Sequence, residues 1–237
     1  MLGPLANSAA IIAGGLAGAA FGPRVPRRVR EAMPLTCGLI SLGIGAALMP
    51  KMDSIPAVAL ALLLGALIGE LLYLERGLER AIGWAQAAVQ RRWPSERGNP
   101  RVEGFVTQYV TLLVLFCASG TGVFGAMNEG MTGNADILLA KAMLDLVTAT
   151  LFATELGMAV ALIAAPQILV QLALYFSASL LLPLTTPAML GDFAACGGVI
   201  MLATGLRICG IKIFPIVNML PALVLVMPVS ALWARFF

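Results

Sequence analysis

The sequence predicts an all-α protein that spans a membrane as a bundle of about eight helices, with seven as the lower count. Hydrophobic residues make up 60% of the 237 residues and charged residues only 11%, whereas a soluble domain carries about 25% charged residues. The mean hydropathy is +0.95. A soluble fold could not cover so much apolar surface with so few polar side chains, so the lipid bilayer is the predicted solvent of this chain.

Eight apolar segments are long enough to cross a hydrocarbon core of about 30 Å, for which a helix needs roughly 20 residues. The fifth and sixth run together, because only Glu155, Gly157 and Pro166 interrupt the apolar sequence between them. We treat the segments as one integral membrane domain, residues 1–237. In chain order they are predicted at 3–22, 33–49, 56–74, 105–127, from 136 to between 154 and 164, 166–182, 190–208 and 213–233.

Basic residues set the predicted orientation. The first segment precedes its positive charges, which is the wrong order for a cleaved signal peptide, so it is predicted to remain as the first helix. With the N-terminus outside, 12 of the 15 lysine and arginine residues fall on cytoplasmic loops, as the positive-inside rule favours. We therefore expect a bacterial inner-membrane protein with both termini in the periplasm. The 12 residues are Arg24, Arg27, Arg28, Arg30, Arg76, Arg80, Arg91, Arg92, Arg97, Arg101, Arg207 and Lys212.

The longest polar stretch, residues 75–103, is predicted to form a cytoplasmic amphipathic helix and a linker. Apolar residues recur at helical spacing over 75–93, opposite several charges, which is typical of a helix lying on the membrane surface. The alternative is that the third membrane helix simply continues into the cytoplasm. The recurring residues are Leu74, Leu78, Ile82, Ala85, Val89 and Trp93.

Glycines at four-residue spacing predict two close helix contacts. Gly14, Gly18 and Gly22 share a face of the first segment, and Gly65 and Gly69 share a face of the third. Small residues at this spacing let another helix backbone approach closely, which gains dispersion contacts that lipid does not replace. The contact is either internal to the bundle or the interface of a homodimer.

Charged residues inside the apolar segments are candidates for function. Lys141 and Asp145 are spaced i and i+4 on the fifth segment, so they share a helix face. Asp145 lies about 13 Å from the start of that helix, near the middle of the hydrocarbon core, so it must face the bundle interior or water. The pair either couples transport to an ion or locks helices together. Asp192, which begins the seventh segment, is expected to complement the positive end of the helix dipole.

Two Thr-Gly steps are candidates for breaks in membrane helices. The first includes Ser119, Thr121 and Gly122, and the second begins at Thr204. Glycine weakens a helix, while Ser and Thr side chains satisfy backbone groups that unwinding frees. Two such interruptions in opposite senses are typical of transporters built from inverted repeats. The alternative is that both steps mark ordinary helix ends.

Other polar side chains in or beside the apolar segments are candidates for binding or for contacts between helices. Arg207 either binds an anionic group of a solute or anchors the chain at the cytoplasmic face. Asn7 and Asn218 either bind a ligand or bond across helices, and Gln167 and Gln171 share a face of the sixth segment, where bonds between helices are expected.

Several functional classes lack support in the sequence. Histidine is absent and no CxxC pair occurs, so neither a metal site nor a disulfide framework is predicted. Common enzyme motifs are missing, and we expect neither catalysis nor a cofactor. The basic clusters flank apolar segments, which favours a topology signal over nucleic-acid binding. The four cysteines are Cys37, Cys117, Cys196 and Cys209.

Five phrases carry a family resemblance: residues 64–70, 114–122, 125–133, 182–187 and 203–212. With these phrases, the chain resembles the YqgA-like family of bacterial inner-membrane proteins, which are grouped as a domain of unknown function. The resemblance covers essentially the whole chain. It implies a protein with many membrane spans, for which transport is suspected, and it brings no established catalytic residues.

The sequence favours a transporter of a small solute or ion, with a pathway past Lys141, Asp145 and the Ser119–Gly122 break. Charged groups at depth beside an irregular helix are the reason. The alternatives are a membrane scaffold or signalling protein, which would act through its glycine faces and cytoplasmic helix, and a channel. The lipid bilayer is the one partner that all three share.

Overall fold

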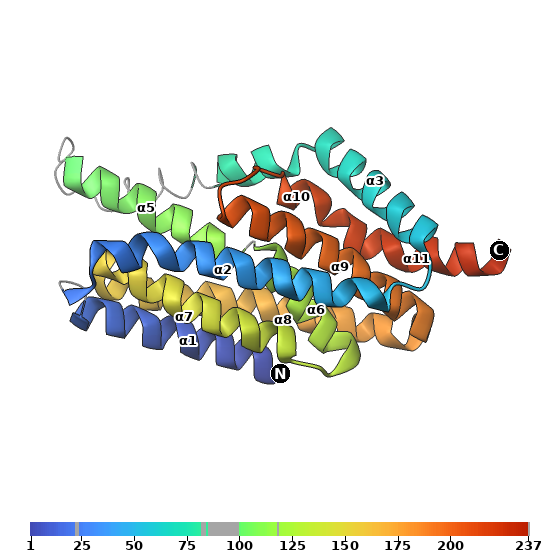
Figure 1. Cartoon of the computed structure of the whole chain (residues 1–237), viewed down its shortest axis with the longest axis horizontal. Coiled ribbons are helices and arrows are strands. Elements are labelled where there is room, and N and C mark those ends of the chain that lie inside the picture. The colour runs from blue at the N-terminus through green and yellow to red at the C-terminus, as the bar shows by residue number, and fades with distance from the viewer. Residues whose placement is uncertain (22–23, 82–83, 85–99, 118, 237) are drawn as a thin grey trace.

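The protein is a bundle of long helices, as predicted. The computed structural model describes residues 1–21, 24–81, 84, 100–117 and 119–236, and all regular elements in these ranges are helical. The start of α1 and the end of α11 point toward the same end of the molecule (Figure 1). In chain order the helices are α1 (Leu2–Phe21), α2 (Arg27–Leu48), α3 (Ile55–Leu71), α5 (Pro100–Cys117), α6 (Gly120–Thr132), α7 (Asp136–Leu156), α8 (Ala164–Leu181), α9 (Pro187–Ile208), α10 (Ile216–Met219) and α11 (Pro221–Phe236).

The number of crossings depends on how two irregular stretches are counted. Within the described ranges, six helical stretches are long and apolar enough to cross a membrane, and α3 with the bent segment Leu74–Ala81 makes a seventh. The longest stretch, Asp136–Leu184, has 49 residues and would measure roughly 70 Å if it were straight. It doubles back at Gly157, where φ is +63°, into the arms α7 and α8 (Figure 1). Counting the arms separately gives eight crossings.

Two helix caps and one proline explain where three predicted segments differ from the helices in the structure. The segment predicted at 105–127 is two helices, because Ser119 caps α6 by accepting a hydrogen bond from the Gly122 N–H at 3.0 Å. Helix α9 begins at Pro187 rather than at residue 190, because the Thr186 hydroxyl caps it. The last predicted segment, 213–233, is divided into α10 and α11 just before Pro221, a residue that cannot donate a backbone hydrogen bond.

The predicted cytoplasmic helix is described only in its first part. Leu74–Ala81 is helical and is bent by 47° from α3, with Tyr73 in a left-handed conformation (φ 52°) at the bend. The stretch therefore leaves α3 at an angle, and both the surface helix and its alternative stay predictions. Residues 82–83 and 85–99, which include most of the predicted helix and linker, lie outside the described residues.

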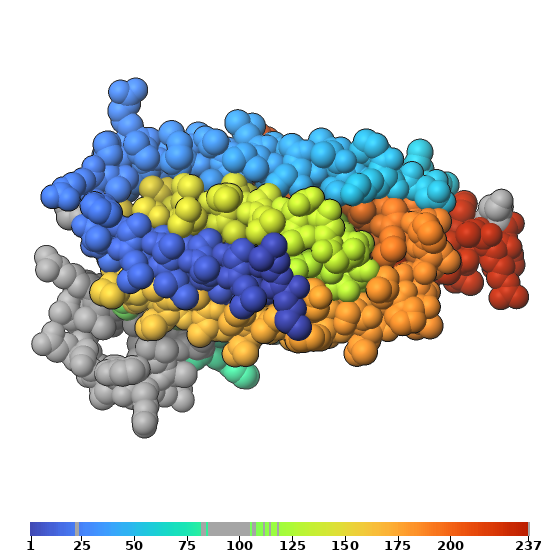
Figure 2. Space-filling model, turned by 90° about the horizontal axis from the view of Figure 1, so that it is seen from below, coloured from blue at the N-terminus to red at the C-terminus, as the bar shows by residue number. Residues whose placement is uncertain are grey.

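Glycine contacts hold α1 against α7 inside the bundle. A Cβ on Gly14 would lie 2.9 Å from the Cβ of Ala149, and one on Gly18 would lie 2.6 Å from the Cβ of Ala153. Residues four apart on one helix thus meet residues four apart on the other, and the two helices run parallel. The opposite face of α1 lies on the surface of the molecule (Figure 2). The interpretation that these glycines form contacts inside the bundle fits the structure, and a homodimer stays a prediction.

The helices α2 and α9 are also packed backbone to backbone. A Cβ on Gly45 would lie 2.7 Å from the carbonyl oxygen of Gly198, and one on Gly205 would lie 2.7 Å from that of Gly38. The Ser41 hydroxyl donates a hydrogen bond of 3.0 Å to the carbonyl of Met201 between these two contacts. This antiparallel pair forms one wall of the interior.

Adding a methyl group at Gly18 is expected to destabilise the fold. The new Cβ of Gly18→Ala would lie 2.1 Å from the carbonyl oxygen of Thr150, which is a backbone atom that cannot turn aside. Overpacking of this kind costs about 1–3 kcal/mol, so the midpoint of thermal unfolding in detergent should fall.

The matched control is Gly43→Ala in α2, where no atom lies within 4 Å of the added Cβ. Alanine is a better helix former than glycine by about 0.5–1 kcal/mol, so this variant should unfold at the same temperature as the parent or slightly above it. An equal loss in both variants would contradict close packing at Gly18.

Candidate solute site

A cavity of about 550 Å³ brings together most of the polar residues singled out in the sequence. It lies between two apolar clusters, because its lining includes Phe116 from one and Ile216 from the other. Six of the eight predicted pathway residues line it, and they come from three different helices and the turn before α6. They are Ser119, Thr121, Lys141, Asp145, Thr204 and Arg207.

The two remaining predicted residues, Gly122 and Asn218, do not line the cavity but contact residues that do. A Cβ on Gly122 would lie 2.8 Å from Cε of Lys141, so glycine leaves the space that the lysine side chain occupies. Asn218 bonds across elements, as one of its two interpretations proposed, because its Oδ1 accepts a 2.7 Å hydrogen bond from the N–H of Glu75.

The ion pair at the inner end of the cavity is nearly closed off from solvent. Lys141 Nζ donates to Asp145 Oδ2, and the two side chains are only 3% and 11% exposed. The lysine also lies over the ring of Phe116, 5.7 Å from its centroid. Each charge here needs the other, because an unpaired ion costs several kcal/mol at this depth.

Two further ion pairs stand at the outer rim of the cavity and are more accessible. Arg207 Nη1 lies 2.7 Å from Glu75 Oε1, and Arg30 Nη1 lies 3.8 Å from Glu155 Oε1. Their side chains are 19–57% exposed. The cavity therefore runs from a solvated rim with two ion pairs to a buried floor with one, and paired basic and acidic groups occur along its whole length.

Glu75 fixes the rim to the rest of the bundle. Besides its contact with Arg207, its Oε2 accepts a 3.0 Å hydrogen bond from the N–H of Val217. Arg207 donates in turn to the carbonyl of Phe214 at 3.1 Å. The bend after α3, the end of α9 and the start of α10 are thus joined by one acidic side chain, so Arg207 is more than a surface anchor.

The two Thr-Gly steps meet at the cavity wall, but only one breaks a helix. A Cβ on Gly120, in the first step, would lie 3.2 Å from Oγ1 of Thr204 in the second. Helix α9 continues unbroken through the second step, where Thr204 donates to the carbonyl of Ile200 at 2.8 Å. The predicted interruption there is wrong, because the hydroxyl bonds within its own helix. Inverted repeats stay a prediction.

Asp192 has a different role from the one predicted. It is fully buried, and its Oδ1 accepts hydrogen bonds from the N–H groups of Asp53 and Ser54 at 2.9 and 2.8 Å. Its Oδ2 accepts a 2.7 Å bond from the Ser230 hydroxyl. It therefore ties the start of α3 and helix α11 to α9, while Thr186 caps α9 itself.

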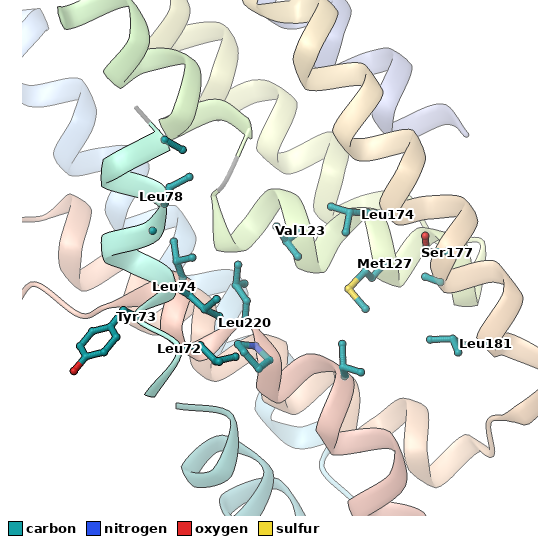
Figure 3. Close-up of a pocket in the computed structure, with 16 residues that line it drawn as sticks. Leu72, Tyr73, Leu74, Leu78, Val123, Met127, Leu174, Ser177, Leu181 and Leu220 are labelled. Carbon is teal, nitrogen blue, oxygen red and sulfur yellow. The ribbon is translucent and has the colours of Figure 1, made fainter. Parts of the chain in front are cut away.

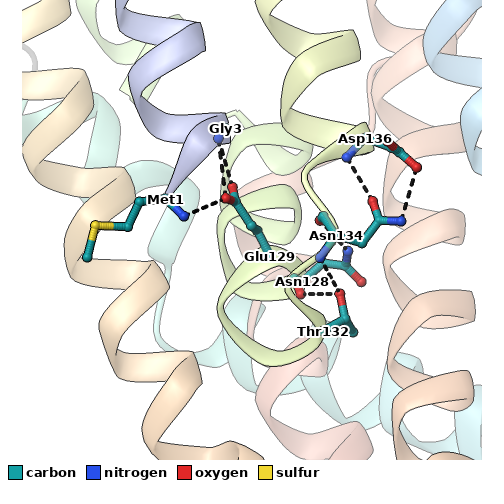
Figure 4. Close-up of polar contacts among 7 residues, drawn as sticks. All are labelled: Met1, Gly3, Asn128, Glu129, Thr132, Asn134 and Asp136. Carbon is teal, nitrogen blue, oxygen red and sulfur yellow. Dashed lines mark hydrogen bonds and ion pairs between the residues drawn. The ribbon is translucent and has the colours of Figure 1, made fainter.

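Sequence reasoning missed the acidic half of the rim and one buried acid. In the sequence, Glu75 and Glu155 mark boundaries of apolar segments and Arg30 belongs to a basic cluster, and none of them indicates a partner. Glu129, in α6, is 2% exposed, and a carboxylate in the apolar stretch after the first Thr-Gly step is itself a signal of function. Its Oε1 and Oε2 accept from the Gly3 N–H at 3.3 and 3.1 Å (Figure 4).

A second hollow, of about 720 Å³, is almost wholly apolar. It lies between the bend after α3 and helix α11 on one side and helices α6 and α8 on the other (Figure 3). Leu72, Met127 and Leu174 are typical of its lining. None of the described residues that line this groove is charged, so the charged cavity is the candidate site.

Comparison with known proteins agrees with the resemblance in the sequence. The profile of DUF554, described as a protein of unknown function, matches residues 2–231. The chain belongs to the DUF554 family. This DUF554 protein is 53% identical over 237 residues to the uncharacterized protein YqgA of Escherichia coli (strain K12), covering 100% of this chain and 99% of the relative.

A more distant DUF554 relative is described as a membrane protein. It is the uncharacterized membrane protein YdfK of Bacillus subtilis (strain 168), with 25% identity over 229 residues, 95% of this chain and 93% of the relative. No solved structure matches. Membership in the family and the location in a membrane are thus established, and the charged cavity is the feature from which function must be argued.

Removing one partner of the buried pair is expected to destabilise the protein more than removing both. Asp145→Asn leaves the Lys141 ammonium without a counter-charge, which costs about 3–5 kcal/mol for a buried pair. The double variant Lys141→Met/Asp145→Met leaves no charge and should recover most of that loss. Thermal unfolding in detergent measures both, and a double variant no more stable than Asp145→Asn would contradict the pairing.

Proposed function

We propose that this protein transports a small solute or ion across the bacterial inner membrane, and that the charged cavity is its binding site. The observation that carries the proposal is the buried Lys141–Asp145 pair at the floor of a cavity whose rim is solvated. A pair needed only for structure would not require open space beside it, because each ion already has its counter-charge. A pair that adjoins open space can exchange its partner for a passing solute or ion.

The arrangement of charge suggests what the cavity accepts. Each ion pair offers a guanidinium or ammonium group beside a carboxylate, so the lining presents both signs of charge along its length. Hydroxyl groups of Ser119, Thr121 and Thr204 stand between them. A small polar solute with both donor and acceptor groups, such as a zwitterion, fits this lining better than an apolar or a large anionic molecule.

The rim is proposed to face the cytoplasm. Arg30 belongs to the first basic cluster of the sequence and Arg207 to the last, and both stand at the rim. The positive-inside rule places these clusters at the cytoplasmic face, with both termini then in the periplasm. In this orientation the cavity is open to the cytoplasm and closed toward the periplasm at Lys141 and Asp145.

This asymmetry favours a transporter over the alternatives. A channel needs a continuous pore, whereas the cavity ends at buried side chains. A scaffold would need its glycine faces free, whereas Gly14, Gly18 and Gly65 are used in contacts within the bundle. A binding site open to one side only is the arrangement that alternating access requires.

Transport should depend on the pair and not on stability alone. We expect Asp145→Asn and the double variant Lys141→Met/Asp145→Met to lose uptake in proteoliposomes screened with a panel of small amino acids, carboxylates and inorganic ions. The double variant is the matched control, because it should remain folded. Uptake equal to that of the parent in the double variant would show that the pair is structural and would overturn the proposal.

The orientation of the cavity can be measured with cysteine labelling. Thr148, on the same helix as Asp145, lines the cavity, so Thr148→Cys should react with a charged, membrane-impermeant thiol reagent in inside-out vesicles. Ala149→Cys is the control, because Ala149 is fully buried in an apolar cluster. Peptide mapping distinguishes these sites from the natural cysteines, and labelling of Thr148→Cys only from the periplasmic side would reverse the orientation.

A further inference from the structure

Four buried polar side chains on α1 and α8 have no hydrogen-bond partner among the described residues. They are Asn7, Ser8, Gln167 and Gln171, each exposed by 6% or less. The bonds between helices that were expected for the two glutamines are therefore not formed, and Asn7, for which ligand binding was the alternative, makes no hydrogen bond of good geometry. An amide buried without a partner costs roughly 1–3 kcal/mol, so a group of them needs an explanation.

Helix register places the four side chains in one region. A Cβ on Gly15 of α1 would lie 3.0 Å from the Cβ of Ala161, and α8 then runs antiparallel to α1. Gln167 lies roughly 10 Å beyond Ala161 along the chain direction, which brings it level with Ser8. Gln171 lies about one turn further. Ser8 and Gly15 are seven residues apart, so they occupy the same face of α1.

Asn7 connects this group to the floor of the cavity. It occupies the face of α1 that carries Gly14 and meets α7, and it lies close enough to Asp145 to interact with its carboxylate, although its amide has no partner at hydrogen-bond geometry. A line of polar groups therefore leads from Asp145 through Asn7 to the glutamines on α8.

Beyond Gln171, helix α8 packs against α6 near a buried acid. Tyr175, about one turn beyond Gln171, contacts Gly130, since a Cβ there would lie 2.3 Å from the tyrosine carbonyl oxygen. The neighbouring residue is the buried Glu129, which accepts from the backbone of Gly3. Helix α6 then ends at an exposed turn, where Asn134 bonds to Asp136 (Figure 4).

We propose that Asn7, Ser8, Gln167 and Gln171 form the periplasmic half of the solute pathway, which is closed in this structure. The inference rests on the proposed transport function and extends it beyond the cavity. Uncharged amide and hydroxyl groups provide donors and acceptors for a small polar solute and for water once the half-path opens. Their unbonded state in the closed form leaves no hydrogen bond to break on opening.

Helix α1 is the element that opens this half-path. One of its faces lies on the surface of the molecule (Figure 2), and the other meets α7 and the turn after it through Gly14, Gly15 and Gly18. At Gly14, Gly15 and Gly18 the contacts involve backbone and small side chains, so a shift of α1 along its neighbours has to repack few large side chains, chiefly Ile11. The shift would separate Ser8 from the face of α8 that carries the glutamines.

Thiol labelling from the periplasmic side tests the proposal. In cells with a permeabilised outer membrane, Gln167→Cys should react with a positively charged, membrane-impermeant methanethiosulfonate at least tenfold faster than Ala164→Cys. The control lies one turn earlier on the same helix and is buried in an apolar cluster. Peptide mapping by mass spectrometry identifies the modified residue.

Labelling of Gln167→Cys from neither side, or only from the cytoplasm, would overturn the periplasmic half-path. If Thr148→Cys is still labelled from the cytoplasm in that case, the cavity and the proposed function survive. If Thr148→Cys is also unreactive from both sides, the proposed function fails with it.

A second variant separates this role from a structural one. Gln167→Met/Gln171→Met keeps side-chain length and removes the unbonded amides, so its Tm should rise, while uptake of the solute found for the parent should fall at least tenfold. A lower Tm would show that the amides hold the helices together. A raised Tm with full uptake would also overturn the proposal.

Discussion

The constraint on which this structure depends is that ions cannot stay unpaired in a medium of low dielectric constant. Lys141 and Asp145 face each other on one helix face, and α5, α6 and α9 surround them without expelling the open space beside them. Lys141 and Asp145 are buried so deeply that each needs the other as its counter-charge. They also lie close enough to the cavity for a bound solute or ion to replace that counter-charge. The two solvated pairs at the rim are less constrained: Arg207 and Glu75 join α9 to the bend after α3, and Arg30 and Glu155 join α2 to α7.

Close approach of backbones gives this site its walls. Helices that meet through glycine and alanine, as α1 with α7 and α2 with α9, leave little room for side chains between them. Only small polar side chains such as Ser41 fit within these contacts, and longer ones project from other faces. On α7 and α9 those faces carry Asp145, Thr148 and Thr204 into the cavity, while the large apolar residues cover the surface that meets lipid.

The parts of the fold that were predictable are those encoded locally. The length of the apolar segments predicted the membrane helices. The i, i+4 spacing of Lys141 and Asp145 placed both residues on one helix face without knowledge of any tertiary contact. Much of the candidate site could be assembled for the same reason, because charged residues are rare inside apolar segments, whereas Thr-Gly steps are a weaker signal that also occurs at residues 132–133.

What could not be predicted depends on contacts between distant parts of the chain. Nothing near Glu75 indicates Arg207 as its partner, and Asp192 resembles a cap of its own helix although it holds the start of α3. The second Thr-Gly step has the composition of a break, but the hydroxyl of Thr204 returns to its own helix. In the sequence, Gln167 and Gln171 resemble residues that form hydrogen bonds between helices. Only their positions in the structure show that their side chains have no such partner.

The central claim is that one part of the interior is wet and another is dry, and two natural cysteines report on it. Cys37 lines the charged cavity, whereas Cys196 is fully buried in the apolar cluster around Phe124 and Phe193. The decisive measurement is the rate at which a small charged methanethiosulfonate modifies each thiol in the unaltered, membrane-embedded protein. We predict that Cys37, which is 7% exposed, is modified measurably faster than Cys196, which should react only when the protein unfolds. Equal protection of both thiols would contradict a water-filled cavity beside Asp145.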